Sequence, residues 1–241
     1  MKKPLVSLSV VSHGQARLVK LLVADLKRLA LADVELIITV NLPEDETFYK
    51  DTGYPTVIVR NAVPKGFGEN HNAALLHSSG SFFAVVNPDV RLTQLDLSLL
   101  LQPMHDRKVG AVAPVILNAA GSVEDSVRRF PTVSGLFRRV VFKETKPGYS
   151  WGNDTIAVDW AAGMFVIFRR EAFVQVSGFD DKRFFMYFED VDICARLWKA
   201  GWKVLLQPQV SVIHDAQRAS HRSFKHMKWH LSSAVRYLTG I

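Results

Sequence analysis

Four short apolar runs, separated by helical patterns, constrain the fold of this chain more than any other feature of its sequence. They are Leu5–Val11, Val34–Val40, Thr56–Arg60 and Phe82–Val86. Each run is short and largely apolar, as expected of a strand buried on both faces. Between them, apolar residues recur at helical spacing in 18–31 and 69–76. The alternation predicts an α/β fold with a mostly parallel central sheet flanked by helices.

Polar residues follow three of these runs at the point where each predicted strand ends. Ser12 and His13 follow the first run, Asn41 follows the second, and Asn87-Pro88-Asp89 follows the fourth. Ligands of open α/β sheets bind beyond the carboxyl ends of the strands. We therefore expect these three loops to converge on one crevice, although Asn-Pro-Asp on its own is also ordinary turn chemistry.

The second half of the chain continues the mixture of strands and helices. We predict strands at 111–117, 157–160, 164–168, 202–206 and 210–213, and helices at 95–104, 171–177 and 224–238. Between residues 125 and 151 the pattern weakens and Lys and Arg accumulate, which indicates a loop or a solvated basic face. The last helix combines an apolar stripe with basic residues, so it either packs on the domain or rests on a membrane surface.

Composition narrows the class of protein. A chain of 241 residues with 48% hydrophobic and 22% charged residues suits one compact domain. The net charge of +7 favours anionic partners such as nucleotides, phosphates, lipid headgroups or nucleic acid. A single cysteine, Cys194, excludes an internal disulfide and, on an apolar helix face, is expected in the core. With no apolar run of about 20 residues and no signal-peptide pattern, we expect a cytoplasmic protein.

The stretch from Phe184 to Trp202 carries the strongest chemical signal. Aromatic residues run directly into Glu189, Asp190 and Asp192, and a helical pattern follows up to Gly201. The first two acids are expected at the helix N-terminus, where the helix dipole helps a carboxylate to stay ionised. Asp192 can pair with Arg196 one turn later. Taken alone, the stretch fits an ordinary acidic helix start equally well.

Three further features are each weak evidence for a binding site when taken alone. Asp89 is a suitable ligand for a hard cation beside phosphates, but turns of this kind are common. His214 follows a predicted strand and suits a metal, although most such histidines are structural. The loop from Gly66 to Asn72 opens a helix whose amides could meet an anion.

In chain order, these motifs together resemble the inverting, nucleotide-sugar-dependent glycosyltransferases of family 2, which have the GT-A fold. The resemblance covers essentially the whole chain and is carried by the residues 10–13, 66–72, 87–90, 160–165, 169–173, 178–180, 184–202 and 214. Within the family, the chain is most similar to bacterial rhamnosyltransferases. Asn87-Pro88-Asp89-Val90, the run 184–192, Ser-Val-Arg-Arg-Phe-Pro at 126–131 and the tail at 229–238 carry this narrower match.

The resemblance implies a role for each matching residue. Asp89 and His214 would hold Mg²⁺ or Mn²⁺ against the donor diphosphate, with one acid fewer than usual because Asn87 stands where the family has its first aspartate. Asp190 would be the general base that takes a proton from the acceptor hydroxyl. Glu189 would orient the acceptor or share the base role.

The remaining site residues are assigned by the same resemblance. Donor binding is assigned to Ser12, His13, Asn41, Gly66, Asn72, Asn87, Arg218 and Arg222, and the sugar or acceptor pocket to Trp160, Gly163, Met164 and Tyr187. Residues 1–90 would form the nucleotide-binding half, 91–215 the acceptor and catalytic half, and 216–241 a basic loop and helix. The chain departs from the family after its first two strands, where Ser12-His13-Gly14 and Val40-Asn41 replace the usual motifs and put the base of the donor in doubt.

The function implied is metal-dependent transfer of rhamnose from dTDP-rhamnose to a hydroxyl of a bacterial surface glycan or a polyprenyl-linked glycolipid, as in O-antigen and other cell-envelope polysaccharides. Two alternatives stay open. One is the same chemistry with another donor, such as UDP-galactofuranose or UDP-hexose; the other is a non-catalytic basic module that binds membrane or nucleic acid. Under the enzyme hypothesis no nucleic-acid partner is expected, and the C-terminal helix would contact the inner face of the cytoplasmic membrane.

Overall fold

The computed structural model describes residues 3–132, 148–214 and 224–239. The strands are β1 (Val6–Ser12), β2 (Val34–Val40), β3 (Thr56–Arg60), β4 (Phe82–Val86), β5 (Val90–Arg91), β6 (Val109–Asn118), β7 (Val127–Arg128), β8 (Ile156–Ala157), β9 (Trp160–Ala161), β10 (Phe165–Arg169) and β11 (Lys203–His214). The helices are α1 (Ala16–Leu29), α2 (Phe67–Leu76), α3 (Leu97–Leu101), α5 (Arg170–Gln175), α6 (Glu189–Lys199) and α7 (Phe224–Thr239), with short 3₁₀ turns at Thr47–Lys50 and Gln102–His105.

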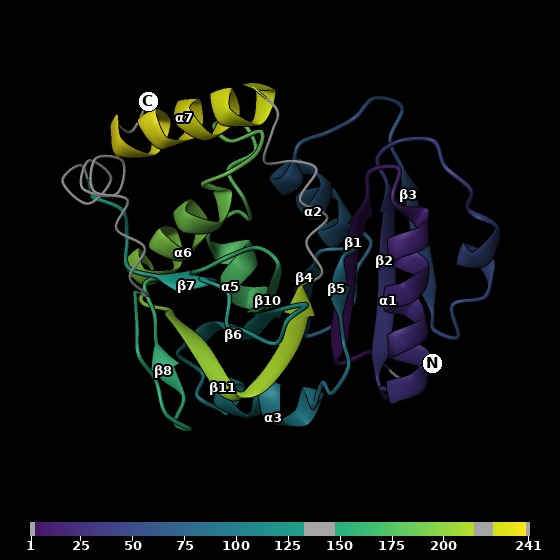
Figure 1. Ribbon diagram of the computed structural model, residues 1–241, viewed down its shortest axis with the longest axis horizontal. Helices are drawn as coiled ribbons and strands as arrows, with labels where there is room; N and C mark the ends of the chain where they lie inside the picture. Colours follow the sequence, from purple (N-terminus) through teal and green to yellow (C-terminus); the bar gives the residue numbers. More distant parts are fainter. Residues whose placement is uncertain (1–2, 133–147, 215–223, 240–241) are drawn as a thin grey trace.

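One large mixed sheet runs through the molecule in the order β3-β2-β1-β4-β10-β6-β11-β5, and β8 pairs with β11 (Figure 1). The four N-terminal strands are parallel to one another, and β11 is parallel to β6. Only β10 in the middle and the short β5 and β8 run antiparallel to their neighbours. The prediction of a mostly parallel α/β sheet flanked by helices is confirmed.

Apolar side chains alternate between the two faces of this sheet. In β4, Ala84 and Val86 join the cluster that contains α1, whereas Phe83 and Val85 join the cluster that contains α2, α5 and α6. Successive residues of a strand point to opposite faces, so one continuous apolar run supplies two cores. Cys194 is buried in the second cluster, as predicted.

Most predicted elements are present, and the bounds of β2, β3 and β4 are as predicted. The helix predicted at 95–104 is wrong in its length, because α3 ends at Leu101 and a 3₁₀ turn containing Pro103 follows. The strand predicted at 157–160 is also wrong: β8 pairs with β11, while β9 pairs with β7 in a separate two-stranded sheet. The strands predicted at 202–206 and 210–213 are one strand, β11, with a register shift between Gln207 and Ser211.

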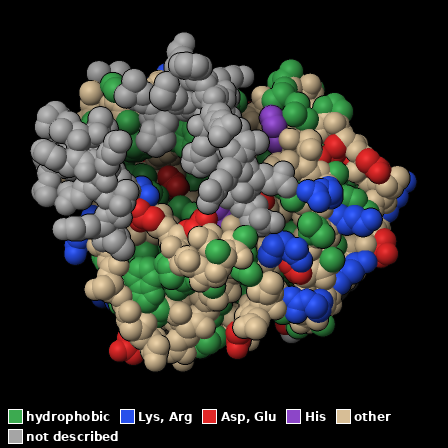
Figure 2. Space-filling model, in the orientation of Figure 1, with side chains coloured by type: hydrophobic (Ala, Val, Ile, Leu, Met, Phe, Trp, Pro, Cys, Tyr) green, Lys and Arg blue, Asp and Glu red, His purple; other side chains and the backbone are tan. Residues whose placement is uncertain are grey.

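Two surface features bear on function. Lys and Arg side chains gather over α1, where Arg17, Lys20, Lys27 and Arg28 are exposed (Figure 2), so part of the positive charge lies on a solvated helix face. Helix α7 lies along the top of the molecule in Figure 1, next to the N-terminal end of α6. Among the described residues, no helix has both the length and the apolar character needed to cross a bilayer.

Candidate active site

The carboxyl ends of β1 and β2 meet, as the sequence predicts. The side-chain amide of Asn41 lies 3.0 Å from Nδ1 of His13, and the backbone amide of Asn41 donates to the carbonyl of Ser12 at 2.8 Å. The hydroxyl of Ser12 is buried and donates to Glu44 at 2.7 Å. Ser12 therefore stabilises the loop after β2, while His13, the next residue after β1, is exposed to solvent.

Asn41 itself is buried and joins β2 to the loop that precedes α2. Its side-chain oxygen accepts from the backbone amide of Lys65 and from Asn61, both at 2.8 Å, and its amide group donates to the carbonyl of Lys65. The side-chain oxygen and amide group of Asn41, which we predicted to bind the donor, thus make hydrogen bonds within the protein. Within the described structure, Asn41 holds the loop around Lys65 against the carboxyl end of β2.

A histidine between two carboxylates lies at the end of β11. Antiparallel pairing of β11 with β5 places His214 opposite Val90 and so beside Asp89, with Nε2 of His214 3.4 Å from Oδ1 of Asp89. On the other side of the ring, Nδ1 lies 3.0 Å from Oε2 of Glu124. Burial alone lowers the pKa of His214, but attraction to Asp89 and then to Glu124 outweighs it, so the pKa is raised.

The carboxylate of Asp89 and the imidazole of His214 suit a divalent cation that takes its other ligands from substrate and water. Oδ1 of Asp89 is buried and accepts no hydrogen bond from the described residues, and an imidazole nitrogen faces it. In the described part of the chain, no three His, Cys, Asp or Glu side chains are arranged to hold a metal ion by themselves. Mg²⁺ and Mn²⁺ commonly take one or two protein ligands and complete their shell with phosphate oxygens and water. The residues present fit such an ion.

Asp190 lies in the first turn of α6 and is tied to the loop that bears Asp89. Its Oδ2 accepts a hydrogen bond of 3.2 Å from the backbone amide of Gly163. The carbonyl of the next residue, Met164, accepts a bond of 2.9 Å from the amide of Asn87. Antiparallel pairing of β10 with β4 creates this arrangement, so a two-residue turn holds both predicted functional groups at one end of the sheet.

The two acids at the start of α6 do not behave as the helix-dipole argument predicts. Burial, followed by the charge of Asp190, raises the pKa of Glu189 well above its usual range, and Oε2 of Glu189 has no hydrogen-bond partner among the described residues. Burial also raises the pKa of Asp190, although bonds from the amides of Gly163 and Val191 and the charge of Arg128 oppose this effect. Desolvation outweighs the dipole here, because two carboxylates share an apolar site.

The loop before α2 packs against the aromatic segment that precedes α6. The amide of Phe67 donates to the carbonyl of Phe185 at 3.0 Å, and a Cβ on Gly66 would lie 2.5 Å from that carbonyl oxygen. Asn72 bonds to the backbone of Phe179 through both its side-chain oxygen and its amide group. Gly66 and Asn72 thus hold the acid-bearing half of the site against α2, and their assignment to donor binding stays a prediction.

Three residues of the predicted acceptor pocket, Trp160, Met164 and Tyr187, make packing contacts. Trp160 donates through Nε1 to the carbonyl of Arg129, and the guanidinium of Arg128 lies over its ring, 5.8 Å from the centroid. Met164 is half-buried and packs against the main core, and its assignment to the sugar pocket stays a prediction. Tyr187 is half-buried against the small cluster around Phe184, Phe188 and Val191.

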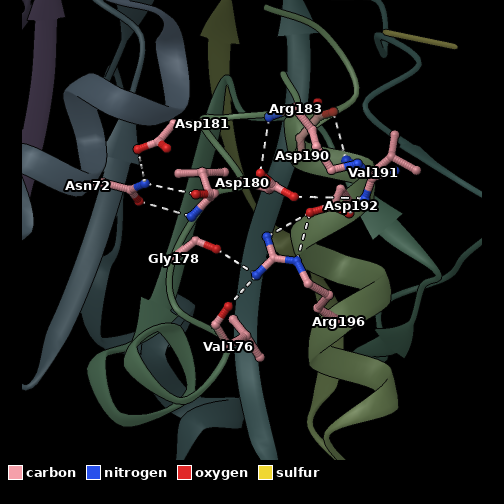
Figure 3. Close-up of polar contacts among 11 residues, drawn as sticks. Asn72, Val176, Gly178, Asp180, Asp181, Arg183, Asp190, Val191, Asp192 and Arg196 are labelled. Carbon is pink, nitrogen blue, oxygen red and sulfur yellow. Dashed lines mark hydrogen bonds and ion pairs between the residues drawn. The ribbon is translucent and has the colours of Figure 1, made fainter. Parts of the chain in front are cut away.

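Asp192 pairs with Arg196, as predicted from their spacing. The guanidinium of Arg196 lies between Oδ2 of Asp192, at 2.7 Å, and the carbonyls of Val176 and Gly178 (Figure 3). Arg183 approaches the same carboxylate at 3.6 Å. This network anchors α6 to the preceding loop. The predicted donor-binding residues Arg218 and Arg222 lie outside the described residues.

Glu124 is the site residue that sequence reasoning missed. Parallel pairing of β6 with β11 sets Asn118 opposite His214, and the chain then turns back so that the amide of Glu124 bonds to the carbonyl of Ile116. The contact spans 90 positions in the sequence. An acid shortly after a predicted strand was the only local signal, and it carried no information about the partner strand.

Comparison with known proteins identifies the family and the fold of the chain. The sequence model of glycosyl transferase family 21 matches residues 69–232. The rhamnosyltransferase WbbL of Escherichia coli K12 is 32% identical over 97% of this chain and 92% of its own length. An N-acetylglucosaminyl-diphospho-decaprenol L-rhamnosyltransferase of Mycobacterium tuberculosis is 33% identical over 64% of this chain, which spans about half (53%) of that relative.

Solved structures share the fold at low sequence identity. GalNAc-T7 in complex with UDP, GalNAc and Mn²⁺ superposes with a TM-score of 0.66 at 16% identity, covering 89% of this chain and 44% of that one. The mannosyltransferase PcManGT of Pyrobaculum calidifontis, in complex with GDP-Man and Mn²⁺, superposes with a TM-score of 0.62 at 17% sequence identity. The match covers 98% of this chain and 65% of that one. The chain therefore belongs to glycosyl transferase family 21, a group similar to family 2, and is an inverting glycosyltransferase with the GT-A fold.

Proposed function

We propose that this enzyme transfers L-rhamnose from dTDP-rhamnose to a hydroxyl of a polyprenyl-diphosphate-linked glycan, in the presence of Mg²⁺ or Mn²⁺. The observation that carries the proposal is the turn at Gly163-Met164, which bonds to Asp190 on one side and to the Asp89 loop on the other. It joins the half-buried carboxylate of Asp190 to a group suited to a cation and a diphosphate. Sugar transfer from a nucleotide needs those two groups close together.

Asp190 is the general base of the proposed reaction. It takes the proton from the acceptor hydroxyl while the hydroxyl oxygen attacks the anomeric carbon, and the bond from that carbon to the diphosphate oxygen breaks. A single displacement of this kind inverts the anomeric configuration and needs no enzyme nucleophile. The raised pKa of Asp190 makes its carboxylate a stronger base than an exposed aspartate.

Asp89 and His214 would hold the cation, and Glu124 holds His214. A divalent cation bound there would supply charge neutralisation for the departing diphosphate. Glu124 accepts from Nδ1 of His214, which keeps Nε2 free to face Asp89. Carboxylates commonly orient metal-binding histidines in this way. GalNAc-T7 and PcManGT were crystallised with Mn²⁺, which supports the choice of a divalent ion.

The choice of rhamnose and of a lipid-linked acceptor rests on the relatives. The relatives from E. coli and M. tuberculosis are named as rhamnosyltransferases, and the name of the latter includes a diphospho-decaprenol acceptor. Because such acceptors are anchored in a bilayer, we place the enzyme at the cytoplasmic face of the membrane. A second donor stays open, because a relative from Haloferax volcanii, 28% identical over 54% of this chain, is named a hexosyltransferase.

A donor screen with purified protein tests the proposal. We expect release of dTDP from dTDP-rhamnose in the presence of a GlcNAc-diphospho-lipid acceptor and Mn²⁺, and no release after treatment with a chelator. Turnover of UDP-hexose or UDP-galactofuranose in place of dTDP-rhamnose would refute the assignment of rhamnose as the donor sugar. The assignment of the reaction as sugar transfer would still stand. Failure of any nucleoside diphosphate to raise the melting temperature with Mn²⁺ would favour a non-catalytic binding module, since saturation at 100 times Kd should add about 2.7 kcal/mol of stability.

A further inference from the structure

The two residues immediately before the acid pair adopt an unfavourable backbone conformation. Tyr187 has φ of 71° and Phe188 has φ of 69°, in the left-handed region. Residues with a Cβ rarely occupy this region, and two consecutive aromatic residues there need support from their surroundings. Strain of this kind persists where the structure holds it and is concentrated at functional sites.

One side of the strained pair is held by α2. The carbonyl of Phe185 accepts from the amide of Phe67, and the missing side chain of Gly66 allows this close approach. The other side is held by α7. The hydroxyl of Ser233, which is buried, donates to the carbonyl of Met186 at 2.9 Å.

Two arginines extend the contact with α7. The guanidinium of Arg183 donates to the carbonyl of Arg236, and the guanidinium of Arg236 donates to the carbonyl of Arg183, each at 2.8 Å. The carbonyls of the last helical turn lack intrahelical partners, so Arg183 also completes the C-terminal end of α7. The ring of Tyr237 packs against Phe188 with centroids 5.7 Å apart.

The contacts of α7 thus enclose the segment that leads into α6. Arg183 lies before the strained pair and Asp190 follows it, while Met186 and Phe188 are contacted directly by α7. The carboxylate of Asp190 must remain within reach of the amide of Gly163, which it contacts at 3.2 Å. A displacement of about 1 Å at a reacting group can cost a factor of about 100 in rate.

We infer that α7 is a positioning element for catalysis, in which Ser233 and Arg236 hold the left-handed Tyr187–Phe188 pair and thereby the carboxylate of Asp190. The inference rests on the base role proposed above for Asp190. It also gives the C-terminal helix a function on the enzyme itself, in addition to any contact with a membrane.

The test compares Ser233→Ala and Arg236→Ala with Thr239→Ala. Thr239 is a matched control, because among the described residues its hydroxyl bonds only within α7, to the carbonyl of Val235, and the residue is exposed. We expect kcat to fall about 10- to 100-fold in Ser233→Ala, with KM for the donor and affinity for dTDP unchanged. We expect kcat to fall in Arg236→Ala as well. Arg236→Lys keeps a hydrogen-bond donor and the positive charge, so it should recover part of the lost kcat.

Hydrogen exchange provides a readout that needs no substrate. We expect the amides of 184–191 to exchange at least about tenfold faster in Ser233→Ala than in Thr239→Ala, with the strands of the central sheet unchanged. Exchange and kcat equal to those of Thr239→Ala would overturn the inference, and so would a loss of protection spread over the whole chain. If the wild-type protein transfers no sugar, the proposed function fails, while the exchange experiment still decides whether α7 holds the segment.

Discussion

Replacement of Asp190 by asparagine is the sharpest test of the catalytic assignment. The amide side chain keeps an oxygen that can accept the hydrogen bond from the Gly163 amide, so the turn that links Asp190 to the Asp89 loop should remain. What is lost is the ability to take a proton. General bases contribute factors of about 10² to 10⁴, which correspond to about 3 to 5 kcal/mol of barrier. We expect kcat to fall by that factor, with the affinity for dTDP and Mn²⁺ unchanged.

The same substitution should make the protein more stable at neutral pH. The pKa values of Glu189 and Asp190 are raised in the folded state. For an acid, a raised folded-state pKa means that stability is lost as the pH rises from the unfolded-state pKa through the folded-state pKa, at about 1.4 kcal/mol for each pH unit between them. Asp190→Asn removes one of these ionisations and the charge that raises the pKa of Glu189. Its advantage in melting temperature over wild type should therefore grow as the pH rises from about 4 through the raised folded-state pKa values.

The assay combines initial rates of dTDP release with thermal unfolding across this pH range. Asp154→Asn is the matched control, because Asp154 is an exposed aspartate in the loop before β8, and it should change neither quantity. Wild-type turnover in Asp190→Asn would refute the base assignment. A loss of activity together with a lower melting temperature would refute the argument that the acid pair costs stability.

Three further substitutions test the surroundings of the site. Glu124→Gln should weaken Mn²⁺ binding about 10- to 100-fold, measured by titration in the presence of dTDP, and unchanged affinity would contradict the orienting role. Gly163→Ala would place a Cβ 2.9 Å from the ring of Phe67, so we expect activity to fall at least about tenfold; full activity would show that the turn tolerates displacement. Arg196→Met leaves the buried carboxylate of Asp192 with a weaker partner and should cost about 2 kcal/mol, a fall of about 4 to 8 °C in melting temperature by calorimetry; an unchanged value would assign the network no stability.

The local pattern of the chain was sufficient for elements whose residues agree with their final environment. Strands β2 and β4 are predicted to the residue because their apolar runs are buried on both faces. The pairing of Asp192 with Arg196 follows from helical spacing alone. The helix predicted at 95–104 is wrong in its length because Pro103 favours a tighter turn after α3. The spacing of apolar residues does not take into account the effect of a proline on the helix backbone.

The sequence by itself determined the class of fold, the three loops that follow its N-terminal strands, and the acidic helix start at Glu189 and Asp190, because each depends on residues close together in the chain. Only the tertiary structure decided which groups meet. Strand pairing brings Glu124 to His214, and the turn at Gly163 brings its amide to Asp190. The tertiary structure also decided that the pKa values of the acid pair are raised, because burial depends on packing from distant segments and outweighs the local helix dipole.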